Sequence, residues 1–183
     1  MRAASLHARS CEQAVARDLI SRGVTSPAKL GCQGGSNGGL LTGNMLARSP
    51  DLFGAIVCQV PLLDMRRFHK LLAGASWMGE YGDPDTDDWS FLQRYSPYHN
   101  LDEATAYPPI LVTTSTRDDR VHPGHARKLV SKLLDLGKGP STFYYENIEG
   151  GHGGAANNKQ RAFMSTLAYS FLEQTLASKN RGE

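Results

Sequence analysis

The amino-acid sequence predicts an α/β fold in which about four parallel strands are flanked by helices. Two observations carry this prediction. Short apolar segments alternate with longer segments of helical periodicity, and a repeated strand–helix–strand order favours parallel strands joined by helical crossovers. A length of 183 residues, with 40% hydrophobic and 21% charged residues, is typical of one globular domain with a buried core. We therefore expect residues 1–183 to form a single domain.

The first part of the chain supplies two helices and two strands. Gly23 is expected to end the first helix. The apolar face of that helix carries Val15, Leu19 and Ile20. The run Gly54–Val60 is largely apolar, as expected for a strand buried on both faces. In chain order, the predicted elements are helix Glu12–Arg22, strand Lys29–Gln33, helix Asn37–Arg48 and strand Gly54–Val60.

The second part begins with a less regular segment, residues 62–107. Proline-containing turns there separate two predicted helices, Asp64–Ala73 and Trp89–Tyr95. The alternation then resumes with strand Pro109–Ser115, helix Gly124–Leu136, strand Ser141–Asn147 and helix Asn157–Ala177. The side chains of the helix after Gly124 that we expect to face the core are Leu129, Val130, Leu133 and Leu134.

Charge and cysteine content exclude several classes of protein. The formal net charge of +2 gives no electrostatic footprint for nucleic acid or an anionic membrane. Three cysteines without a CxxC pair favour neither a disulfide framework nor a zinc site. The first ten residues lack the apolar stretch of a secretory signal, which favours a cytoplasmic location. We expect no metal and no other cofactor.

The sharpest local motif is Gly34-Gly35-Ser36-Asn37-Gly38, which fits the pattern G-x-S-x-G between a strand and a helix. This pattern is typical of a tight turn that exposes a serine hydroxyl, with glycines where a Cβ would collide with neighbouring backbone. The N-terminus of the following helix would favour a developing oxyanion. A phosphate-binding loop is disfavoured because no lysine follows, and the dinucleotide pattern G-x-G-x-x-G is not met.

A nucleophilic serine needs a base and an orienting carboxylate, and both follow later predicted strands. Asp118 and Asp119 come after one strand, and spacing alone does not distinguish them. His152, between two glycine pairs, comes after the last strand. Carboxyl ends of parallel strands meet at one edge of a sheet, so these groups can converge there. The pair His122 and His125 lacks a third ligand, and we interpret both residues as solvent-facing at a helix start.

Four motifs together resemble the catalytic domain of the prolyl oligopeptidase family of serine peptidases, from about Val24 to Leu176. The motifs are Gly34-Gly35-Ser36-Asn37-Gly38-Gly39, Ser49-Pro50-Asp51-Leu52-Phe53-Gly54, Asp118-Asp119-Arg120-Val121 and Gly151-His152-Gly153. The resemblance implies a partial α/β-hydrolase fold holding the later strands of the sheet. It implies Ser36 as nucleophile, Asp118 as acid, His152 as base and the Asn37 N–H as oxyanion donor. It also implies that Arg120 binds a substrate carbonyl and that Trp77, Tyr81 and Val121 line the specificity pocket.

The chain also departs from the family. Nothing corresponds to the family's β-propeller or to the first half of its hydrolase domain, which supplies a second oxyanion donor, and residues 1–10 do not resemble family sequence. Strand Lys29–Gln33 would then be an open edge, which we expect a second copy of the chain, or residues 1–22, to cover. We expect a serine hydrolase acting on small peptides or esters. The alternative is a catalytically impaired module that assembles without turnover.

Overall fold

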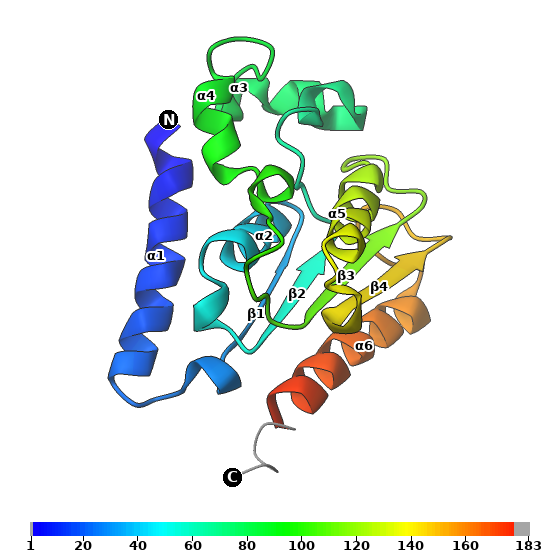
Figure 1. Cartoon of the computed structure of the whole chain (residues 1–183). Helices are drawn as coiled ribbons and strands as arrows, with labels where there is room; N and C mark the ends of the chain where they lie inside the picture. Colours follow the sequence, from blue (N-terminus) through cyan, green and yellow to red (C-terminus); the bar gives the residue numbers. More distant parts are fainter. Residues whose placement is uncertain (1, 178–183) are drawn as a thin grey trace.

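The computed structural model describes residues 2–177, with side chains from residue 11 onward, and is built on a parallel sheet of four strands (Figure 1). The strands lie in chain order, and each pairs in parallel with the next. The predicted parallel α/β architecture is therefore confirmed. The strands are β1 (Gly31–Gly35), β2 (Ala55–Gln59), β3 (Ile110–Ser115) and β4 (Thr142–Asn147).

Helices cover both faces of this sheet. On one face, Ile56 and Cys58 of β2 belong to a buried cluster shared with α2 and α5. On the other face, Val57 of the same strand packs against α6. This alternation buries β2 on both sides, as its apolar run predicts. The three helices are α2 (Asn37–Arg48), α5 (Gly124–Asp135) and α6 (Asn158–Ala177).

One predicted core residue of α5 is on the surface. Leu129, Val130 and Leu133 are buried as expected, but Leu134 is 52% exposed. The prediction for Leu134 is wrong because the buried stripe of this helix is narrower than the run of apolar residues in its sequence.

The first helix, α1, spans Arg2–Ser21 and so begins ten residues earlier than predicted. Ala16 is its buried contact with the core, whereas Val15 is 58% exposed rather than inward. Gly23 ends the helix as predicted: its φ is +68°, and the N–H of Val24 donates to the carbonyl of Leu19 at 3.0 Å. The early start is compatible with the alanine-rich composition of residues 2–11, which favours helix without an apolar stripe to signal it.

Residues 62–107 form a chain of short turns with a small core of their own. The predicted helix Asp64–Ala73 is wrong: Leu72 has a φ of +48°, and Gly74 packs so closely on the carbonyl of Phe68 that no Cβ would fit. The predicted helix Trp89–Tyr95 forms one helical turn that tightens into a 3-10 turn. The short elements here are η3 (Phe68–Lys70), η4 (Leu72–Trp77), α3 (Met78–Tyr81), α4 (Trp89–Leu92), η5 (Gln93–Tyr95) and η6 (Pro97–Asn100). Elsewhere lie η1 (Pro27–Lys29), η2 (Pro50–Leu52) and η7 (Gly139–Ser141).

The outer edge of β1 pairs with no strand within residues 2–177. Helix α1 lies beside this edge (Figure 1), and a groove of about 350 Å³ separates it from the start of β1. Leu30, Cys32 and Phe53 line the groove from the sheet side. Covering of this edge by a second copy stays a prediction. None of the helices in the described part of the chain combines the length and apolarity needed to cross a bilayer.

Candidate active site

Ser36 occupies the tight turn between β1 and α2. Its φ of 59° and ψ of −116° are rare for a residue with a side chain, and such strain clusters at functional sites. The turn is fixed because the Ser36 N–H donates to the carbonyl of Gln59 at 2.9 Å, and the Ser36 carbonyl accepts from the N–H of Leu40 at 3.1 Å. The serine thus lies in a tight strand-to-helix turn, as predicted, and the structure adds that its backbone is strained.

The glycines of this motif differ in what they are needed for. A Cβ at Gly34 would collide with the backbone carbonyl of Gly38, as the motif predicts. A Cβ at Gly38 would meet nothing within 4 Å outside its own helix, so the predicted steric need there is wrong. The second close approach is at Gly39, where a Cβ would lie 2.6 Å from the Cβ of Pro61. The turn therefore depends on Gly34 and Gly39.

Asp118 lies in the loop after β3, and its side chain is fully buried. Its Oδ1 accepts hydrogen bonds from the backbone N–H groups of Arg120 at 2.9 Å and Val121 at 2.8 Å. Asp119, its neighbour, is exposed. These bonds fix the orientation of the Asp118 carboxylate and distinguish it from Asp119, which the sequence alone leaves open.

His152 lies in the loop after β4 and connects the serine to the buried carboxylate. Its Nδ1 is 2.9 Å from Asp118 Oδ2, and its Nε2 is 3.1 Å from Ser36 Oγ. An acceptor-only carboxylate at Nδ1 favours the tautomer with the proton on Nδ1. Nε2 is then free to accept the proton of the serine hydroxyl, which is what a general base must do.

Asn147, a residue that sequence reasoning missed, holds the loop that carries His152. It is the last residue of β4 and is buried. Its Oδ1 accepts from the N–H groups of Glu149 at 2.9 Å and Gly150 at 3.1 Å, and its Nδ2 donates to the carbonyl of Gly154 at 3.1 Å. One amide side chain thus ties both arms of the loop. In the sequence, the one feature that could have indicated this role of Asn147 is its position at the end of a predicted strand.

A cavity of about 230 Å³ opens beside Ser36. The four predicted substrate-binding residues, Arg120, Trp77, Tyr81 and Val121, all line it. The structure adds two lining residues that sequence reasoning missed, Leu62 and Glu80. No local pattern marks them, because the cavity joins segments far apart in the chain.

Asn37 contributes to the same cavity at the start of α2. The first N–H groups of an α-helix have no acceptor within the helix, so the backbone N–H of Asn37 is available to a ligand. Its side-chain oxygen is already used, because the Tyr81 hydroxyl donates to Asn37 Oδ1 at 2.9 Å. This bond joins one wall of the cavity to the serine turn.

His125 is buried, so the prediction of a solvent-facing residue is wrong. It is 1% exposed, and its Nδ1 accepts from the backbone N–H of Asp64 at 3.1 Å and of Leu63 at 3.4 Å. Burial lowers the pKa of His125 to about 4, which keeps Nδ1 a hydrogen-bond acceptor. The residue therefore joins α5 to the loop after β2. A buried and an exposed histidine look alike in sequence when both lie at a helix start.

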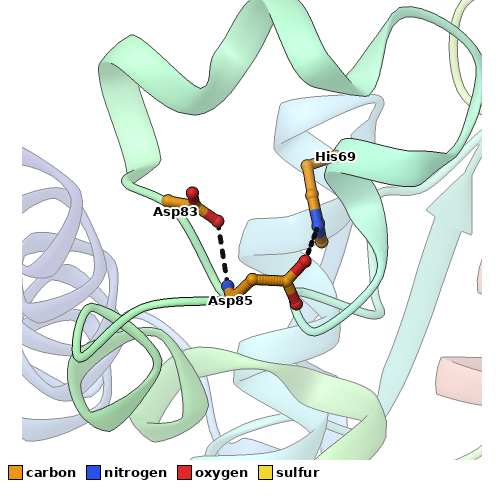
Figure 2. Close-up of side chains that lie close together, drawn as sticks. All are labelled: His69, Asp83 and Asp85. Atoms are coloured by element: carbon orange, nitrogen blue, oxygen red, sulfur yellow. Dashed lines mark hydrogen bonds and ion pairs between the residues drawn. The ribbon is translucent and has the colours of Figure 1, made fainter.

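Three side chains in the irregular segment lie close enough together to resemble a metal site (Figure 2). One ligand atom from each of His69, Asp83 and Asp85 lies within 4.8 Å of the others. Other contacts explain this cluster: Lys70 Nζ is 2.7 Å from Asp85 Oδ2, and Asp83 Oδ1 accepts the N–H of Asp85 at 2.9 Å. The hydrogen bonds from Lys70 and His69 hold the pKa of Asp85 at about 2. We assign no metal to the cluster, since a cation would have to displace Lys70.

Comparisons with known proteins all point to one family. A sequence profile of the prolyl oligopeptidase family matches residues 12–179. An uncharacterized peptidase of Sinorhizobium fredii is 52% identical over 165 residues, which cover 90% of this chain and 22% of that protein. A prolyl endopeptidase of Dictyostelium discoideum is 38% identical over 167 residues, covering 88% and 22%. The solved structure of a post-proline cleaving enzyme from Rickettsia typhi has a TM-score of 0.82 and 40% identity, covering 89% of this chain and 24% of that one. The chain spans less than a quarter of the length of these relatives.

Proposed function

The chain belongs to the prolyl oligopeptidase family, and from this premise we propose that Ser36, His152 and Asp118 carry out the acyl transfer of a serine peptidase. The sheet is a partial α/β-hydrolase fold, as the sequence predicts. The observation that carries the proposal is the continuous hydrogen-bond chain from Ser36 Oγ through the imidazole of His152 to Asp118, at 3.1 and 2.9 Å.

Each member of this chain has one task in the proposed reaction. Ser36 Oγ attacks the carbonyl carbon of the scissile bond while its proton passes to Nε2 of His152. Asp118 stabilises the imidazolium that forms. The same Nε2–H then protonates the leaving amine or alcohol as the carbon–heteroatom bond breaks, leaving an acyl group on Ser36. Water, deprotonated by His152, attacks this acyl-enzyme and releases the acid.

The oxyanion of the tetrahedral intermediate lies at the N-terminus of α2. The N–H of Asn37 donates to it, and the helix dipole favours the negative charge. Loss of one oxyanion donor typically lowers the rate by ~10²–10³. Ester bonds depend less on protonation of the leaving group than amides do, so we propose that small esters are turned over faster than peptides.

The cavity beside Ser36 suits a proline ring. Trp77, Tyr81 and Val121 supply an apolar and aromatic lining, and the Arg120 guanidinium can donate to a substrate carbonyl. The relatives named prolyl endopeptidase and post-proline cleaving enzyme support the same preference. We therefore propose cleavage on the carboxyl side of proline.

A fluorophosphonate probe, which labels activated serines, tests the proposal. We expect the wild-type protein and a Ser90→Ala control to be labelled and Ser36→Ala to remain unlabelled. Asp118→Asn should slow labelling on the order of 10⁴-fold, because the histidine loses its orienting partner. Folded wild-type protein that is not labelled would favour the catalytically impaired module instead. With a labelled protein, rates on p-nitrophenyl esters and on a proline anilide compare esterase with peptidase activity.

A further inference from the structure

The cavity beside Ser36 contains two side chains of opposite charge, Glu80 and Arg120. Within the described residues, neither forms an ion pair with another side chain within 4.0 Å. The carboxylate that serves Ser36 is, by contrast, paired: Asp118 Oδ2 is 2.9 Å from Nδ1 of His152. Glu80 is exposed, so its unpaired carboxylate is accessible to a ligand that occupies the cavity.

The segment that carries Glu80 is anchored on both sides. Glu80 lies in α3 between Trp77 and Tyr81, which pack against a buried cluster. Tyr81 is only 5% exposed, and its hydroxyl donates to Asn37 Oδ1 beside the serine. The backbone of α3 is thereby held relative to Ser36, so Glu80, whose side chain is exposed, stays beside the cavity.

The two charges recognise different groups. Arg120 has only donors and can bind a carbonyl oxygen, whereas a carboxylate has only acceptors and binds N–H donors, most strongly those that carry positive charge. We propose that Glu80 is a specificity-determining residue that binds a cationic group of the substrate. Two sources share this chemistry: the free amino terminus of a short peptide, and a lysine or arginine side chain next to the proline. This inference rests on the proposed function, since it places the substrate in the same cavity.

Two pairs of chromogenic substrates distinguish these sources. Glycyl-prolyl p-nitroanilide and its N-acetylated form differ in the amino terminus. Acetyl-lysyl-prolyl and acetyl-norleucyl-prolyl p-nitroanilides differ in the side-chain charge. For wild-type protein at low salt, we expect kcat/KM to be about fivefold higher for the charged member of one pair. A preference of this size is what a solvent-exposed ion pair typically contributes. Glu80→Gln should remove this preference, so that the charged and neutral members of the pair are cleaved with equal kcat/KM. Glu173→Gln, an exposed glutamate on α6 outside the cavity, is the matched control.

Binding provides a readout that does not need turnover. Trp77 lines the cavity, so its fluorescence should change when a peptide occupies it. We expect Ser36→Ala protein to bind the charged peptide of the selected pair more tightly, and Ser36→Ala/Glu80→Gln to bind both peptides equally. If no serine is labelled and no substrate is turned over, but this binding preference remains, the proposed hydrolysis fails and the role of Glu80 stands. Absence of a charge preference, or a preference that survives Glu80→Gln, would overturn the inference.

Discussion

Replacing His125 with phenylalanine tests the buried link between α5 and the loop after β2. Phenylalanine keeps a flat ring and removes the acceptor, so two buried N–H groups lose their partner. The bond from Asp64 N–H is 3.1 Å long, of ordinary strength, whereas that from Leu63 at 3.4 Å is weak. An orphaned buried donor costs about 1–3 kcal/mol, so we expect the free energy of unfolding to fall by about 2 kcal/mol.

Urea unfolding followed by circular dichroism measures this loss, and amide hydrogen exchange locates it. In His125→Phe, exchange at Leu63 and Asp64 should accelerate, whereas the amide of Val112 in the sheet core should follow global stability only. His125→Asn is the matched control, because its side-chain oxygen can accept from the same N–H of Asp64. It should preserve the slow exchange at Asp64 even if the smaller side chain lowers stability.

The pH dependence of stability provides a second check. Burial lowers the pKa of His125 to about 4, so folding favours the neutral ring. The contribution of this group is complete above the ordinary histidine pKa of ~6.5 and is lost as the pH falls toward 4, by about 3 kcal/mol at most. The groups that set this pKa, besides burial, are Asp64, Lys128, His122 and Asp118, and all remain in the variant. A difference in stability between wild type and His125→Phe that stays constant over this range would refute the argument.

Three further predictions concern packing, thiols and assembly. Gly39→Ala should lower the free energy of unfolding by about 1–3 kcal/mol, because the added Cβ would overpack against Pro61 after β2. Gly38→Ala should leave the free energy of unfolding nearly unchanged. Urea titration measures both, and equal losses in the two variants would contradict the contact geometry. A thiol reagent should modify exposed Cys11 rapidly in the native protein, partly buried Cys32 more slowly, and buried Cys58 only on unfolding. Burial raises the pKa of both Cys32 and Cys58, that of Cys58 to about 12, and fast modification of Cys58 in the native protein would contradict this burial. We propose that a second copy covers the open edge of β1, so light scattering should give a mass above that of one chain, and a monodisperse monomer would exclude it.

Sequence reasoning succeeded where the signal is local and periodic. The strands and the helices α2, α5 and α6 agree with prediction to within a residue or two because apolar spacing determines which face is buried. The turn at Ser36 was also predictable, because a Cβ at Gly34 would collide with neighbouring backbone and the motif has a glycine there. The prediction of a helix at Asp64–Ala73 was wrong because Leu72 has a positive φ, which is rare for leucine and cannot be predicted from its residue type.

The parts of the site that were missed are those created by distant contacts. Glu80 borders the cavity only because α3 packs beside the serine turn. Asn147 and His125 act through hydrogen bonds to backbone, and any asparagine or histidine has the same donors and acceptors in sequence. The choice between Asp118 and Asp119 likewise required the fold, since burial separates them and spacing does not.

The matching of strand order to chain order has a consequence for the protein during its synthesis. Each strand pairs with the one made just before it, so the sheet can assemble in the order of synthesis, from β1 to β4. Ser36 leaves the ribosome 116 residues ahead of His152, and the proposed base arrives with the last strand. The strained serine turn can therefore form early without a partner to activate it. The hydrogen bond between Ser36 and His152 can therefore form only after β4 has been made.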